Sequence, residues 1–69
     1  MERDPRVDPM PGDVLRFGRH KIDATVAQID GEFINYHVST RKGVLACRCP
    51  VRDWLDFMIG ATVVKRGDE

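Results

Sequence analysis

The stretch IDATVAQIDGEFINYHV, residues 22–38, decides the fold, because two alternating segments flank a turn signal at its centre. Between residues 22 and 29, apolar and polar side chains alternate, which is the pattern of a half-buried strand. Asp30 and Gly31 follow, and both residue types tolerate the positive φ that a tight hairpin turn needs. Residues 33–38 alternate again, so the stretch predicts an antiparallel hairpin.

Working outward from this hairpin, short segments of strand-forming residues alternate with turn-forming residues along most of the chain. Thr40 to Gly43 supplies a second turn, and Gly18 and Gly60 mark further breaks. This spacing of turn-forming residues predicts short strands joined by tight turns. The additional strands are expected at residues 13–17, 44–49 and 61–65.

A short helix is predicted between the last two strands. Pro50 favours a helix start, because its missing N–H would have no partner there, and Gly60 can end the helix in a left-handed conformation. Between them, one apolar stripe recurs at i, i+3, i+4 and i+7. It consists of Val51, Trp54, Leu55 and Met58, and Trp54 is expected to fill one end of the core.

These elements predict a mainly β fold, a five-stranded SH3-like small barrel with one short helix before the last strand. Residues 1–11 are rich in proline and charge and lack periodicity, so we expect a flexible tail there. Residues 12–66 form the predicted barrel, and residues 67–69 are expected to be frayed, because nothing apolar follows Val64.

The opening of the first strand carries a family resemblance. Pro11-Gly12-Asp13-Val14-Leu15-Arg16 resembles the Gly-Asp-x-Val-x-basic opening of KOW modules in ribosomal and transcription-elongation proteins. The resemblance implies an SH3-like barrel that binds RNA. KOW modules usually carry a glycine just before the valine of the second strand, where this chain has threonine.

The same opening is similar to that of plasmid-borne dihydrofolate reductase, a tetramer of SH3-like barrels. The active pore of that enzyme is lined by a Val-Gln-Ile-Tyr segment, whereas residues 44–49 here read VLACRC. The resemblance therefore implies the fold without the activity. The chain also resembles small uncharacterised bacterial or phage proteins that have a Gly-Asp opening and a tryptophan in a helix near the C-terminus.

The length and composition of the chain limit the kinds of function that it can have. The 69 residues provide one small core, too small for an enzyme with a large pocket. Hydrophobic residues make up 42% and charged residues 32%, with 11 basic and 11 acidic side chains, so no overall charge indicates a nucleic-acid or membrane partner. We expect a cytoplasmic monomer that does not enter membranes, because no apolar run is long enough.

Two cysteines and two histidines are the residues from which thiol or metal chemistry could be built. Cys47 and Cys49 are one residue apart, a spacing that suits neither a disulfide nor half of a four-thiolate zinc site. His20 and His37 fall on different elements. We therefore predict no catalytic residues, no metal and no cofactor, and keep a thiol activity of Cys47, Cys49 and His37 as the weakest hypothesis.

Charge is more informative within the predicted barrel, which contains nine basic residues and six acidic ones. Two loops at one end of the sheet could form a basic patch of Arg16, Arg19, His20, Lys21, Arg41 and Lys42. Phe57 and Ile59 lie off the helical stripe and are expected to be partly exposed, as a contact for a protein partner. The sequence thus predicts a non-enzymatic binding module that contacts a protein, with a nucleic-acid-binding barrel as the alternative.

Overall fold

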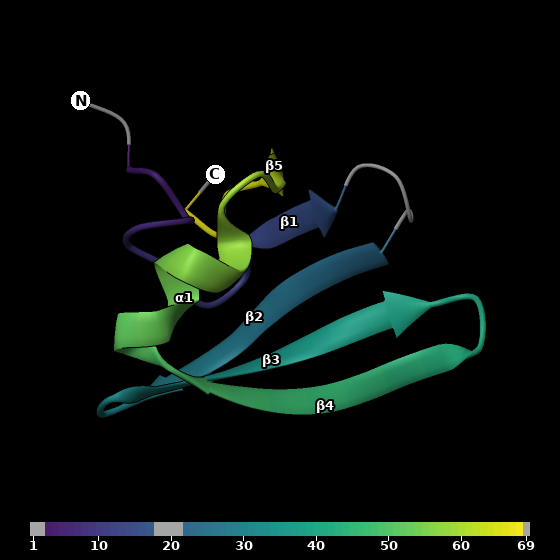
Figure 1. Cartoon of the computed structure of the whole chain (residues 1–69), viewed down its shortest axis with the longest axis horizontal. Helices are drawn as coiled ribbons and strands as arrows, with labels where there is room; N and C mark the ends of the chain where they lie inside the picture. The colour runs from purple at the N-terminus through teal and green to yellow at the C-terminus, as the bar shows by residue number, and fades with distance from the viewer. Residues whose placement is uncertain (1–2, 18–21, 69) are drawn as a thin grey trace.

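The computed structural model describes residues 3–17 and 22–68, which form one five-stranded antiparallel sheet and one short helix (Figure 1). The mainly β prediction and the order of the elements are confirmed. The elements are β1 (Val14–Phe17), β2 (Ile22–Asp30), β3 (Phe33–Thr40), β4 (Gly43–Pro50), α1 (Val51–Met58) and β5 (Thr62–Lys65).

The sheet has the strand order β4-β3-β2-β1-β5, and among the described residues β4 and β5 are its two edges. β2 and β3 form the hairpin that the sequence predicts, with Asp30 paired to Phe33. The turn lies one residue later than predicted, at Gly31 and Glu32, and Gly31 takes the positive φ of 60°. The register then shifts between Val26 and Gln28, a bulge that adds twist to the sheet.

One face of the sheet is buried, because its apolar side chains alternate with polar ones along each strand. The buried positions on this core face come from four strands, and they are Leu15, Ala24, Val26, Ile34, Tyr36 and Cys49. The helix α1 covers one end of this face, where it adds Trp54 and Met58 to the core (Figure 1).

The helix buries half of the predicted stripe. Trp54 and Met58 are buried as predicted, but Val51 and Leu55 are exposed. Phe57 packs instead on the ring of Tyr36, with 5.8 Å between centroids. Phe57 nevertheless stays 43% exposed, close to the 45% of Leu55, so the eight-residue helix buries only Trp54 and Met58.

Residues 3–11, for which the sequence predicts a flexible tail, pack against the helix and the sheet. Pro5 and Pro9 are buried. The indole Nε1–H of Trp54 donates a hydrogen bond of 2.9 Å to the carbonyl oxygen of Pro5. This bond satisfies the only polar group of a buried tryptophan and holds the N-terminal segment against α1.

Asp13 joins the two ends of the described chain. Its fully buried carboxylate accepts two hydrogen bonds of 2.6 Å from the guanidinium of Arg3. It also accepts bonds of 2.7 Å from the backbone N–H groups of Met10 and Gly67. Arg3 additionally pairs with Asp68 at 3.2 Å, so Gly67 and Asp68 have fixed partners although the sequence predicts a frayed end.

Gly67 provides a test of this arrangement. A Cβ at this position would overlap the backbone carbonyl of Pro11, and the backbone cannot yield as a flexible side chain would. We expect Gly67→Ala to lower the free energy of unfolding by about 1 to 3 kcal/mol, the usual cost of overpacking. Urea denaturation followed by circular dichroism measures this loss. Asp68→Ala, which removes only an exposed ion pair, is the control and should cost less than about 1 kcal/mol; equal losses would contradict this packing.

Candidate functional site

The part of the core face that α1 leaves uncovered carries apolar side chains between β1 and β4. Leu45 on β4 is paired with Val38 on β3, and Cys47 is paired with Tyr36, so these side chains share one face of the sheet. Leu45 is 63% exposed, whereas Val38 and Cys47 are half-buried. The edge strand therefore presents an apolar side chain to solvent on the face that elsewhere forms the core.

Aromatic rings extend this surface from the sheet to the helix. The ring centroids of Phe57 and Phe17 are 5.6 Å apart, which joins α1 to β1. Phe57 also packs on Tyr36 and Trp54, yet 43% of it remains exposed. We call the resulting surface the open apolar face, and it consists of Phe17, Val38, Leu45, Cys47 and Phe57.

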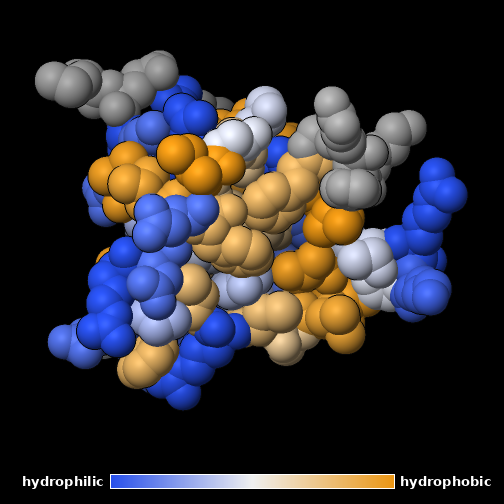
Figure 2. All heavy atoms as spheres, in the orientation of Figure 1, coloured by the Kyte–Doolittle hydropathy of each residue, from blue (hydrophilic) through white to orange (hydrophobic). Residues whose placement is uncertain are grey.

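Figure 2 shows apolar atoms continuing from the helix toward the β3–β4 hairpin, with hydrophilic atoms at the hairpin tip. Ile59, just after α1, is 73% exposed. The exposure of Phe57 and Ile59 agrees with the sequence-based expectation. Sequence periodicity did not identify Leu45 as part of the surface, because its exposure depends on β4 being an edge.

The two thiols lie next to the buried phenol of Tyr36, and the one imidazole among the described residues, that of His37, is not beside them. Cys47 is paired with Tyr36 and His37 with Ala46, so His37 projects from the opposite face of the sheet. Burial, together with the neighbouring Cys47 and Cys49, raises the pKa of Tyr36 to about 12. Burial and the charge of Asp53 raise the pKa of Cys49, which keeps this thiol protonated and poorly nucleophilic at neutral pH.

The residues of the predicted basic patch do not share one environment. The Nε of Arg16 donates a hydrogen bond of 2.7 Å to Asp23, and its charge is compensated by that carboxylate. Arg41 and Lys42 are exposed in the β3–β4 turn, and no ion pair holds either of them within residues 3–17 and 22–68. Arg19, His20 and Lys21 lie outside the described residues.

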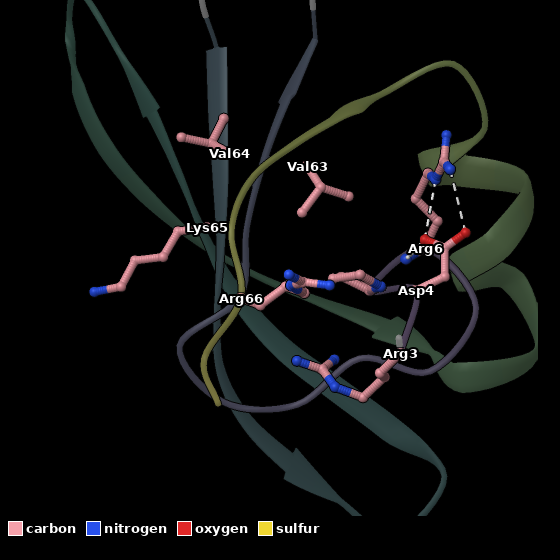
Figure 3. A pocket seen from close by; sticks show the side chains of 8 residues that line it. Arg3, Asp4, Arg6, Val63, Val64, Lys65 and Arg66 are labelled. Atoms are coloured by element: carbon pink, nitrogen blue, oxygen red, sulfur yellow. Dashed lines mark hydrogen bonds and ion pairs between the residues drawn. The ribbon is translucent and has the colours of Figure 1, made fainter. Parts of the chain in front are cut away.

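A hollow of about 410 Å³ between the N-terminal segment and β5 is lined by four cationic side chains (Figure 3). Arg3 is bound to Asp13 and Asp68, and Arg6 is bound to Asp4 at 3.1 Å. Figure 3 shows the side chain of Lys65 directed away from these arginines. Arg3 and Arg6 thus join the N-terminal segment to Asp13 and Asp68 and to its own Asp4.

Within the described part of the chain, no three His, Cys, Asp or Glu side chains form a group that could hold a metal ion. The only helix described, α1, is too short to span a membrane. Neither a protein-family model, nor a curated protein, nor a solved structure matches this chain.

Proposed function

We propose that this chain is a non-enzymatic binding module of the SH3-like barrel class that contacts a protein partner through its open apolar face. The order of elements, five strands with a short helix before the last, supports the fold class. Cys47 and Cys49 are free thiols, which supports a reducing compartment such as the cytoplasm.

The observation that carries this proposal is the exposure of large apolar side chains on one continuous surface. Phe57 and Leu45 contact the core through Phe17 and Val38 but keep much of their area in solvent. Contiguous apolar patches of this kind mark interaction sites on soluble proteins. Ile59, just after α1, is a further large apolar side chain that is exposed.

The proposal is tested by Leu45→Ser and Phe57→Ser in the full chain, with Val7→Ser as the matched control. Val7 is 62% exposed, close to the 63% of Leu45, but belongs to the N-terminal segment. We expect the amount of partner protein retained by the immobilised chain to fall at least about tenfold with Leu45→Ser and with Phe57→Ser. The amount retained by Val7→Ser should be unchanged. The reason is that truncating a central apolar anchor costs more than about 1.4 kcal/mol of binding free energy.

Quantitative mass spectrometry measures the retained proteins, and thermal unfolding reports whether each variant is folded. Leu45→Ser should keep the unfolding transition nearly unchanged, since its side chain is mostly in solvent already. Retention that is equal among all three folded variants would contradict the proposal.

A nucleic-acid-binding barrel is the second candidate, and Arg41 and Lys42, which form no ion pair with any residue that the structure describes, favour it. Contacts to phosphates release counterions, so binding of an RNA or DNA oligonucleotide should weaken steeply with salt. Binding should also fall when Arg19, Lys21, Arg41 and Lys42 are neutralised. Undetectable or salt-independent binding would count against this candidate.

A further inference from the structure

The free edge of β4 is the longest unpaired backbone edge in the described sheet. β4 runs from Gly43 to Pro50, whereas the other edge strand, β5, has only four residues. Thr40 and Gly43 close a two-residue turn, and hydrogen-bonded pairs alternate from there along the hairpin. The N–H and C=O groups of Val44, Ala46 and Arg48 therefore point away from β3, toward the free edge.

This edge lacks most of the features by which proteins block strand addition. Proline, lysine, bulges and covering segments are the usual protection of an edge. β4 has its proline only at the last position, and its register with β3 has no bulge. Val44 and Leu45 are 64% and 63% exposed, so both faces of the strand offer apolar contacts at the edge.

The charge of the β3–β4 hairpin indicates what kind of strand fits. Residues 33–50 contain Arg41, Lys42 and Arg48 but no aspartate or glutamate. All three cations are exposed, and the ion pairs of the described chain do not include them. Antiparallel pairing of β4 with a second copy of this chain would bring these cations near one another, which is unfavourable. An acidic strand would meet the opposite charge.

We propose that β4 accepts an extended peptide with alternating apolar and acidic residues as a sixth strand of the sheet. This inference rests on the proposed protein-binding function and specifies its partner. Apolar side chains of the peptide would pack beside Leu45 and Cys47 on the open apolar face. Its acidic side chains would lie on the other face, near Arg48, and beyond the hairpin turn near Arg41 and Lys42. Backbone hydrogen bonds supply affinity in this mode, and alternate side chains supply specificity.

The probe is a blocked eight-residue peptide of alternating valine and glutamate, titrated into the full ¹⁵N-labelled chain. The reference peptide carries lysine in place of glutamate, and a mixed-sequence single-stranded RNA is titrated in parallel. We expect the glutamate peptide to shift the amide signals of β4 and to slow hydrogen exchange at Val44, Ala46 and Arg48 at least about tenfold, as new backbone bonds form. The lysine peptide should cause no such change.

Ala46→Pro removes an N–H group at the free edge, where proline is tolerated because the β3 ladder does not use that group. Affinity for the glutamate peptide should fall at least about tenfold, while Ala46→Thr, which keeps the N–H, should bind within about threefold of the parent. Arg48→Glu leaves the backbone intact and should shift the preference toward the lysine peptide. If Ala46→Pro does not fold, the change of peptide preference in Arg48→Glu tests the proposal in its place.

Equal binding of the glutamate peptide by Ala46→Pro and the parent would overturn strand addition. Tighter binding of the RNA than of the peptide, or formation of a dimer in place of a peptide complex, would also overturn it. A protein partner that is lost with Leu45→Ser but kept with Ala46→Pro would contradict strand addition alone. A partner kept by both variants would contradict the proposed function as well.

Discussion

Replacing Asp13 with alanine is expected to lower the free energy of unfolding by about 3 to 5 kcal/mol, because the change breaks a buried ion pair by removing one partner. The carboxylate is fully buried and accepts four hydrogen bonds, two of them from Arg3. Its loss leaves the N–H groups of Met10 and Gly67 without their acceptor as well. Urea denaturation followed by circular dichroism measures the effect.

Asp23→Ala is the matched control for this prediction. Asp23 also pairs with an arginine, Arg16, at 2.7 Å, but both side chains are partly in solvent. Exposed ion pairs contribute little, so the control should cost less than about 1 kcal/mol. Similar losses for Asp13→Ala and Asp23→Ala would contradict the central role of Asp13.

The same carboxylate makes stability depend on pH in a defined direction. Burial alone raises the pKa of Asp13, but hydrogen bonds from Arg3, Gly67 and Met10 outweigh burial and hold the pKa below its ordinary value. An unfolded aspartate has a pKa of about 3.9. The contribution of Asp13 is therefore fully present above about pH 4 and is lost as the pH falls through the lower folded pKa. The difference in stability between the parent and Asp13→Ala should narrow in that acidic range.

Replacing Trp54 with alanine is the second large effect, with an expected loss of about 3 to 5 kcal/mol of unfolding free energy. Trp54 is 1% exposed and packs edge-on against Tyr36, with ring centroids 5.2 Å apart. Small domains are stable by only about 5 to 15 kcal/mol, so this loss is a large fraction of the total and should lower the urea concentration at the midpoint of unfolding. Far-ultraviolet circular dichroism across a urea gradient measures this.

Two further variants separate the contributions of the indole. Trp54→Phe keeps an aromatic ring but removes the N–H group that donates to Pro5, so we expect an intermediate loss and faster proteolysis at Arg3 and Arg6. Leu55→Ala changes an exposed residue of the same helix and should cost less than about 1 kcal/mol. A loss for Leu55→Ala equal to that for Trp54→Ala would restore the stripe predicted from the sequence.

Local patterns were sufficient to predict the strands and the helix. The alternation in residues 22–38 and the glycines at the turns are short-range signals, and the structure places strands within one or two residues of the expected bounds. The buried side of α1 was only half predicted. Helical periodicity marks Val51 and Leu55 as apolar positions of the stripe, but it does not show how far the core extends along the helix, and both residues are exposed.

The long-range contacts had no comparable signal. Nothing in the order of residues pairs Asp13 with Arg3 and Gly67, so the N-terminal segment was expected to be flexible. The candidate site likewise depends on contacts between residues that are far apart in the sequence. Leu45 and Phe57 contribute to one surface only because β4 is an edge strand and α1 places Phe57 against Phe17 and Tyr36, and both facts belong to the topology.

The most direct test of binding through the open apolar face is photo-cross-linking from within it. A benzophenone amino acid replaces Leu45 in the full chain, and in a second version it replaces Val7, which has similar exposure. We expect one protein to be cross-linked from position 45 and not from position 7, and the same protein to escape retention by the Phe57→Ser variant. Equal cross-linking from both positions, or adducts to nucleic acid alone, would contradict the proposed function.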